Sequence, residues 1–218
     1  MNRRSLILSV LALGGAGFLG ATWYATRPGS RAVNTVAPEI ADALVRSHSP
    51  ILGNPDAPVT IVEFFDPACE ACRAFHPIVK DILSEHGDAV RVVMRYTPLH
   101  GEASLVAVLT LEAARMQGVF EPVLEALLLH QPKWASHGRM RPDLIRSIAT
   151  EAGLDMEAAR TQIKAPGVVA ALNQDKSDIV TVGVRRTPTF FVNARPLEPF
   201  GEPELRRLVA EEVAATQS

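Results

Sequence analysis

Short apolar runs alternate with amphipathic stretches along this chain, and the two patterns predict a β-sheet interrupted by helices. Residues 59–65 (Val-Thr-Ile-Val-Glu-Phe-Phe) are typical of the apolar runs, because β-branched and aromatic side chains favour a buried strand. The predicted strands span residues 59–65, 90–96, 189–192 and 197–200. Three prolines and Gly53 predict a loop over residues 50–58, since proline lacks a backbone N–H and fixes φ.

Apolar residues spaced three and four positions apart predict the helices. They span residues 38–46, 71–86, 105–116, 120–128, 142–152, 168–180 and 202–214, and Asp155 caps a further short helix. Pro77 falls inside the helix over 71–86 and is expected to kink it. Because most helices fall between the second and third strands, the order predicts an α/β sheet with an inserted helical subdomain at about 101–182.

The N-terminus has the pattern of an export signal. Two arginines precede residues 5–26, which carry no charge and are long enough, at about 1.5 Å per residue, to cross a bilayer. We expect a membrane signal-anchor over residues 1–29, with a cleaved signal peptide as the alternative, and then a linker and short helix over 30–50. The main domain, residues 51–218, would lie in the periplasm or on the extracytoplasmic face of the inner membrane, because positive charge stays inside.

Composition and charge narrow the function classes. The 218 residues, 47% hydrophobic and 21% charged, are typical of a globular protein large enough to bury one core. The formal net charge of -2 and the mixed signs provide no basic field, so nucleic acid is not an expected partner. The chemistry must therefore come from particular residues.

The chain has two cysteines, and both belong to one motif, Cys69-Glu70-Ala71-Cys72, where the strand over 59–65 gives way to a helix. A helix N-terminus stabilises a thiolate, which is the form of cysteine that attacks a disulfide. The motif therefore favours reversible thiol–disulfide exchange, with Cys69 as nucleophile and Cys72 as resolving thiol. Two ordinary buried thiols, or half of a zinc site, are the alternatives.

Four features follow one another in order along the chain. They are Glu63 six residues before Cys69, Phe64-Phe65 before Cys69-x-x-Cys72, Pro77 five residues after Cys72, and Thr187-Pro188 before a strand. Together, from about residue 59 to the C-terminus, they resemble the DsbA-like branch of the thioredoxin superfamily, whose members are exported thiol–disulfide oxidoreductases. The resemblance implies a thioredoxin-like fold with a helical insertion, and no cofactor or metal. It also implies cysteine-containing exported proteins as substrates and a membrane or periplasmic partner that resets the disulfide.

The resemblance also implies roles beyond the cysteines. Glu63 would be a buried acid beneath the thiol pair, with a raised pKa and the ability to relay the proton of Cys72. An outward position on an edge strand is the alternative for this side chain. Pro188 would follow a cis peptide bond and face the disulfide, which leaves the backbone of Thr187 free to pair with a substrate.

Two dipeptides depart from the pattern of the strongest oxidases. Glu70-Ala71 replaces the Pro-His of those enzymes, and a nearby acid raises the pKa of a thiol, so we expect a less oxidising couple. Thr187 is more similar to the reductases and isomerases, whereas the helical insertion favours oxidation, so the direction of exchange stays open. Arg185-Arg186 either offset the acid, grip an acidic partner, or form ordinary surface charge.

His76 creates a second candidate chemistry. The spacing Cys69-x2-Cys72-x3-His76 offers thiolate and imidazole ligands that suit copper or zinc, so a periplasmic copper-binding or copper-delivery protein is the alternative function. A thioredoxin-like recognition module with an idle cysteine pair is a third interpretation. Nearby, Asp66 and Pro67 are expected to shape the approach to the helix.

Overall fold

The protein is built around a five-stranded mixed sheet in which the strand that precedes the cysteine motif lies in the middle. A computed structural model describes residues 35–136 and 139–217. The strands are β1 (Ile51–Gly53), β2 (Val59–Phe65), β3 (Val90–Tyr96), β6 (Thr189–Val192) and β7 (Arg195–Pro196), in the order β1-β3-β2-β6-β7. β2 and β3 run parallel, and the other neighbours pair antiparallel. The carboxyl ends of β2 and β3 therefore meet at the same edge of the sheet.

Strand β2 is buried on both faces, as expected for a strand covered by helices on each side. Side chains alternate between the two faces, so Ile61 and Phe65 pack into the larger core while Val62 and Phe64 pack into the smaller one. Glu63 is two residues from Ile61 and two from Phe65, so its side chain lies on the same face of β2 as theirs, toward the larger core. The alternative of an outward side chain on an edge strand is therefore wrong.

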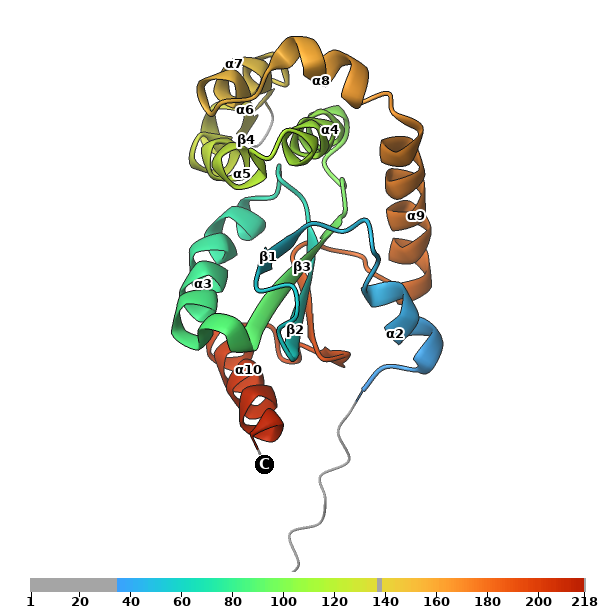
Figure 1. The fold of residues 1–218 in the computed structure, drawn as a ribbon, viewed down its shortest axis with the longest axis vertical. Helices are drawn as coiled ribbons and strands as arrows, with labels where there is room; N and C mark the ends of the chain where they lie inside the picture. The colour runs from blue at the N-terminus through green and yellow to red at the C-terminus, as the bar shows by residue number, and fades with distance from the viewer. Residues whose placement is uncertain (1–34, 137–138, 218) are drawn as a thin grey trace, which may run out of the picture. The chain divides into compact units, whose positions relative to one another are not determined.

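Helices cover both faces of the sheet (Figure 1). On one face lie α3 (Glu70–His86) and α10 (Glu202–Thr216), and on the other lie α2 (Pro38–Leu44) and α9 (Pro166–Val182). Pro77 lies inside α3, and the helix continues through it to His86. The face covered by α3 and α10 carries the larger core, which extends into the inserted helices.

The chain between β3 and β6 is helical, as expected, but the insertion is shorter than the expected 101–182: it lies at the end of the sheet where β3 finishes (Figure 1) and stops before α9, which covers a face of the sheet. Its elements are α4 (Glu102–Met116), α5 (Phe120–Leu129), α6 (Gln131–Trp134), α7 (Asp143–Glu151) and α8 (Met156–Gln162), with the small strands β4 (Ala135–Ser136) and β5 (Arg139–Met140). The 3₁₀ helix η1 (Gly87–Ala89) leads into β3. Leu111, Leu127 and Trp134 are fully buried in the same core as the sheet, so the insertion is packed onto the domain and is not a loose appendage.

A buried ion-pair network holds α2 and α9 against the sheet. Arg95, on β3 and fully buried, donates to Asp175 at 2.8 Å and to Asp178 at 2.6 Å on α9. The same guanidinium donates to the backbone carbonyls of Ala43 and Leu44 at the end of α2. A buried arginine requires this full set of acceptors, because an unpaired buried charge is strongly destabilising.

Two sequence expectations about strands are wrong. The predicted loop over 50–58 contains β1, which pairs with β3 at the edge of the sheet, where flanking prolines are tolerated. The second strand of the C-terminal hairpin is β7 at Arg195–Pro196 and not residues 197–200. Only Leu197 of that segment continues the pairing, through a 3.0 Å bond from its N–H to the Phe190 carbonyl, because Pro199 has no N–H to donate.

The expected signal-anchor or signal peptide at 1–29, including the uncharged residues 5–26, lies outside the described residues. Across residues 35–136 and 139–217, none of the helices combines the length and apolar character that a membrane span requires.

Candidate active site

The two cysteines lie at the turn between β2 and α3. Cys69 is the N-cap of α3, with extended backbone angles (φ -80°, ψ 122°), and Cys72 lies in its first turn. Cys69 is 6% exposed and Cys72 is completely buried, and both thiols are free. The sequence prediction of one dithiol at a helix start, with Cys69 the more accessible sulfur, is confirmed.

The loop before β6 faces this turn because β6 is the antiparallel neighbour of β2. The peptide bond between Thr187 and Pro188 is cis, as the family resemblance implied. The Sγ–H of Cys69 donates a hydrogen bond to the Thr187 carbonyl oxygen at 3.2 Å. The structure therefore brings Cys69 together with a loop 118 residues further along the chain.

The environment of Cys69 favours its thiolate. Its pKa falls from an ordinary 9.0 to about 5, chiefly through a hydrogen bond from the Cys72 thiol, while burial opposes the shift. The Thr187 side chain lowers the pKa further, and so do the first-turn N–H groups of Ala71 and Cys72, which approach the sulfur without forming a full capping hydrogen bond. We expected Glu70 to raise this pKa, but the net shift is downward.

Cys72 has the opposite environment. Burial raises its pKa well above 9.0, and the hydrogen bond to Cys69 and the negative charges of Glu63 and Cys69 add to that increase. The Asp66 backbone N–H, which donates to Cys72 Sγ at 3.4 Å, acts in the opposite direction. At neutral pH the pair therefore holds one thiolate and one thiol.

Glu63 lies beneath this pair and is 1% exposed. Burial, and then the negative charge of Cys69, raise its pKa from 4.5 to about 8. Its Oε1 atom accepts no hydrogen bond from any described residue. A carboxyl group with this pKa is mostly protonated at neutral pH and still able to release its proton.

Sequence reasoning missed the contribution of the helical insertion to this site. Gln131, on α6 and fully buried, donates from Nε2 to the carbonyl oxygens of Pro67 at 2.8 Å and Cys69 at 3.0 Å. Its Oε1 accepts from Arg73 Nε at 3.0 Å. These partners lie about sixty residues apart in the sequence, and no local pattern around Gln131 indicates them.

His76 does not join the cysteines. It is buried on α3, and its Nε2 lies 3.0 Å from Glu125 Oε1, which also accepts from Lys80 Nζ at 2.7 Å. Within the part of the chain that the structure describes, no three His, Cys, Asp or Glu side chains are grouped so that they could hold a metal ion.

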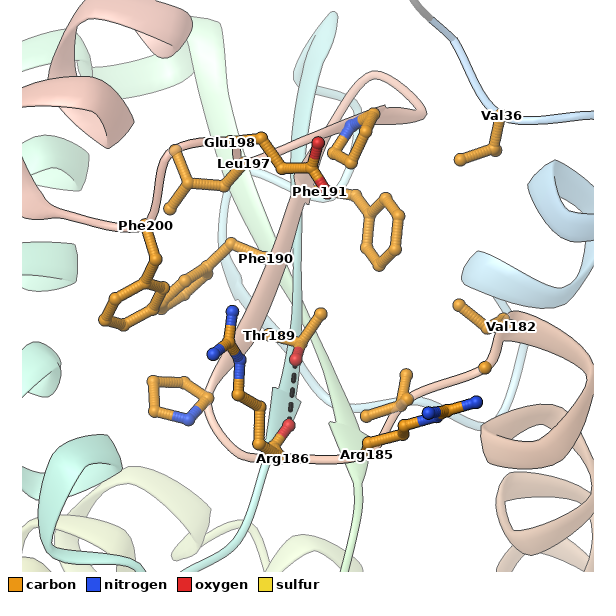
Figure 2. A pocket seen from close by; sticks show the side chains of 14 residues that line it. Val36, Val182, Arg185, Arg186, Thr189, Phe190, Phe191, Leu197, Glu198 and Phe200 are labelled. Carbon is orange, nitrogen blue, oxygen red and sulfur yellow. Dashed lines mark hydrogen bonds between the residues drawn. The ribbon is translucent and has the colours of Figure 1, made fainter.

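A hollow of about 520 Å³ is lined by Pro188, by residues of β6 and by the segments on either side of them (Figure 2). Phe190 and Phe200 lie together on one side of it, with ring centroids 6.4 Å apart. Arg185 and Arg186 are exposed at its rim, where Arg186 extends toward those rings and Arg185 toward the side of Val182. Neither guanidinium forms an ion pair within residues 35–136 and 139–217, which leaves both charges available to a bound segment.

The central sheet, the Cys69-x-x-Cys72 pair at a helix start and the facing cis-proline loop define a thioredoxin-fold protein with a complete dithiol site. Residues 46–211 match the family described as Thioredoxin, and the chain belongs to that family. Its structural neighbours include the thiol-disulfide exchange protein alpha-DsbA2 from Wolbachia pipientis, at 22% identity and a TM-score of 0.66, which shares the fold expected from the sequence.

Two solved structures show the likeness. One is a thioredoxin-like oxidoreductase from Silicibacter pomeroyi DSS-3, at 31% identity and a TM-score of 0.69, covering 81% of this chain and 98% of that chain. The other is oxidised BdbD from Bacillus subtilis, at 25% identity and a TM-score of 0.66, covering 77% of this chain and 94% of that chain.

Sequence relatives are of two kinds. Disulfide bond formation protein D of Bacillus subtilis is 28% identical over 175 residues, which cover 75% of this chain and 77% of that protein. The Na(+)/H(+) antiporter NhaA of Herminiimonas arsenicoxydans is 35% identical over 147 residues, which cover 67% of this chain. The match spans 22% of that antiporter, so the likeness concerns one part of a longer protein.

Proposed function

We propose that this protein is an exported thiol–disulfide oxidoreductase that exchanges disulfides with cysteine-containing proteins through Cys69 and Cys72. The observation that carries the proposal is the contrast within one motif. The Cys69 sulfur contacts the Thr187 carbonyl and has a pKa of about 5, whereas the Cys72 sulfur is buried with its pKa raised. That contrast supports attack by Cys69 and resolution by Cys72.

The exchange balances as two thiolate displacements. A substrate thiolate attacks Cys69 Sγ in the oxidised protein, a new bond joins the two sulfurs, and Cys72 leaves as a thiolate. A second substrate thiolate then attacks the substrate sulfur of this mixed disulfide and releases Cys69 as a thiolate. The substrate gains a disulfide and loses two electrons, and the protein gains them; reduction of a substrate follows the same steps in reverse.

We propose that Glu63 donates the proton that Cys72 takes up in this cycle and accepts it in the reverse direction. Cys72 leaves as a thiolate in a buried site where its pKa is well above neutrality, so it requires a proton donor. Glu63, with a pKa of about 8 and an unpartnered oxygen, holds a proton at neutral pH and can take it back in the reverse direction.

We propose that the substrate segment lies along β6, with its cysteine at Cys69. On this side of β6, β7 pairs with Phe191 and Val192 and the Leu197 N–H bonds to the Phe190 carbonyl, so the start of β6 next to Pro188 is the part open to an added strand. Phe190 and Phe200 would pack against apolar side chains of the bound segment, and Arg185 and Arg186 would favour acidic ones.

For direction, we propose a couple less oxidising than that of the strongest oxidases. The Cys69 pKa of about 5 falls between the values of about 7 in thioredoxin and about 3.5 in DsbA. The reduction potential, measured by equilibration with glutathione, should fall between about -270 mV and about -120 mV. A value at or above the upper limit would refute this part of the proposal.

We further propose that residues 5–26 tether the domain to the inner membrane, with the active site on the periplasmic side. The support is the uncharged sequence that follows two arginines. Fractionation of cells that produce the full chain should recover it with membranes, and recovery of a shortened soluble form would favour the cleaved signal peptide instead.

The decisive experiment traps the exchange intermediate. Cys72→Ala produced in the periplasm should accumulate mixed disulfides with other proteins, visible on non-reducing gels and lost on reduction. The matched control, Cys69→Ala with Cys72→Ala, should form none. If the single variant forms no adducts where it is exported, thiol–disulfide exchange with proteins is not its function.

A further inference from the structure

A fully buried carboxylate, Asp66, lies three residues before Cys69. Its Oδ1 accepts from the Ala68 N–H at 2.9 Å and from Ser104 Oγ at 2.7 Å. Its Oδ2 accepts from the Leu99 N–H at 2.7 Å and the His100 N–H at 3.2 Å, and lies 2.7 Å from His100 Nδ1. A buried carboxylate is retained only where such donors replace its water.

These donors tie together two loops that are distant in sequence. Asp66 directly follows β2, and Leu99 and His100 lie just beyond β3, which is the parallel neighbour of β2. A hydrogen bond from the Thr97 N–H to the Phe65 carbonyl, at 2.8 Å, extends the pairing beyond both strands. The carboxylate therefore fixes the turn before Cys69 to the loop that enters the helical insertion.

The backbone of the same residue points at the resolving sulfur. The Asp66 N–H donates to Cys72 Sγ at 3.4 Å, while burial and the charges of Glu63 and Cys69 all disfavour a thiolate there. This N–H is the contact that opposes them. It can do so only while the turn keeps its position, because a hydrogen bond to a charged group depends strongly on distance and angle.

We propose that Asp66 is a positioning residue for the exchange reaction, whose carboxylate holds its own backbone N–H against the Cys72 sulfur. The inference rests on the function proposed above. In the resolving step the Cys72 thiolate attacks Cys69 Sγ, a bond forms between those sulfurs, and the substrate sulfur leaves as a thiolate. In the opposite direction Cys72 itself leaves as a thiolate, so the N–H stabilises the same charge both ways.

Single-turnover reaction of the reduced protein with dithiobis(nitrobenzoic acid) separates the two sulfurs. In the first phase Cys69 attacks the reagent and releases one coloured thiolate, at a rate proportional to reagent concentration. In the second phase Cys72 attacks the mixed disulfide and releases another, at a rate independent of concentration. Stopped-flow absorbance follows both phases, and their pH profiles report the two thiols separately.

In Asp66→Asn, a side-chain N–H₂ group faces N–H and O–H donors from which it cannot accept a hydrogen bond. The turn before Cys69 should therefore lose its fixed position. We expect the second phase to slow about threefold, because a tenfold loss of Cys72 thiolate is partly offset by the greater nucleophilicity of a more basic thiol. Its pH midpoint should rise, and the first phase should keep its rate. If Asp66 acted through its charge alone, removing that charge would make the second phase faster and overturn the proposal.

Two further variants complete the test. Ser104→Ala keeps the charge, removes one donor to Oδ1 and should slow the second phase less, so it decides the question if Asp66→Asn does not fold. Asp178→Asn loses a buried carboxylate on the opposite face of the sheet and should leave both phases unchanged despite lower stability. Wild-type protein without a concentration-independent phase would defeat the proposed function itself. Two wild-type phases that neither Asp66→Asn nor Ser104→Ala alters would defeat the positioning role alone.

Discussion

Replacing Glu63 with glutamine tests whether a protonated carboxyl group lies beneath the cysteine pair. In the folded protein its pKa is about 8, first because of burial and then because of the Cys69 charge, whereas the unfolded chain ionises near the ordinary 4.5. Between these values the folded state binds more protons than the unfolded state. The contribution of Glu63 to stability is therefore complete below pH 4.5 and is lost as the pH rises through about 8.

The magnitude follows from the size of the shift. Each pKa unit corresponds to about 1.36 kcal/mol, so ionisation of Glu63 reduces the unfolding free energy by about 5 kcal/mol above pH 8 and by about 3 kcal/mol at pH 7. Glutamine has a similar size and does not titrate. The buried amide adds an offset of its own that is independent of pH, so the informative quantity is how the difference between the two proteins changes with pH.

Urea unfolding of the reduced proteins at a series of pH values measures this difference directly. The unfolding free energy of Glu63→Gln, relative to wild type, should increase by about 3 kcal/mol between pH 4.5 and pH 7. Both proteins keep Cys69, whose own titration largely cancels. In the disulfide form the Cys69 charge is absent, so the change should be smaller. A difference that stays flat from pH 4.5 to pH 8 would refute a buried, protonated Glu63.

Other expectations concern the nucleophile, the buried ion pairs and the hollow. Alkylation of the reduced protein by iodoacetamide should show a midpoint near pH 5, from the Cys69 pKa, and a midpoint near that of free cysteine, about 8.5, would contradict it. Burial raises the pKa of Asp178, but hydrogen bonds from two arginines outweigh it and bring the value to about 2. Asp178→Asn should therefore lower the unfolding free energy by about 2 kcal/mol above pH 4, and this loss should disappear in urea titrations as the pH falls toward 2. A loss independent of pH would argue against the ion pair as its cause. Changing Arg185 and Arg186 to glutamate should slow exchange with an acidic cysteine peptide and accelerate it with a basic one of equal length. Equal changes with both peptides would show that the arginines act on the cysteine and not on the substrate.

The framework of the site was predictable because its signals are local. The apolar run of β2, the amphipathic period of α3 and the Thr187-Pro188 pair before β6 each lie within a few residues, and the structure confirms all three. The burial of Glu63 also follows from the period of β2 once that strand is known to lie in the middle of the sheet. The sequence alone left that last condition open.

The missed parts depend on contacts between distant residues. β1 has three residues between prolines, and only its pairing with β3 makes it a strand. The acceptors of Gln131 lie 64 and 62 residues away, and the donors to Asp66 from beyond β3 lie 33 to 38 residues away. Hydrogen bonds of this kind leave no periodic pattern in the sequence, because each requires only one polar side chain, whose partner can be the backbone of any residue at any spacing.

The missed contacts change the role of the helical insertion. Glu63, on β2, and Thr187, in the loop before β6, lie next to the cysteines, but the turn before Cys69 is held by residues of the insertion. Ser104, on α4, bonds to the Asp66 carboxylate, and Gln131, on α6, bonds to the carbonyls that flank Ala68. Because α4 and α6 share one core with the sheet, a change in their packing shifts the donors that fix this turn. The insertion is therefore part of the active site. Substitutions in it can alter the position of the turn before Cys69 without changing the motif between Cys69 and Cys72.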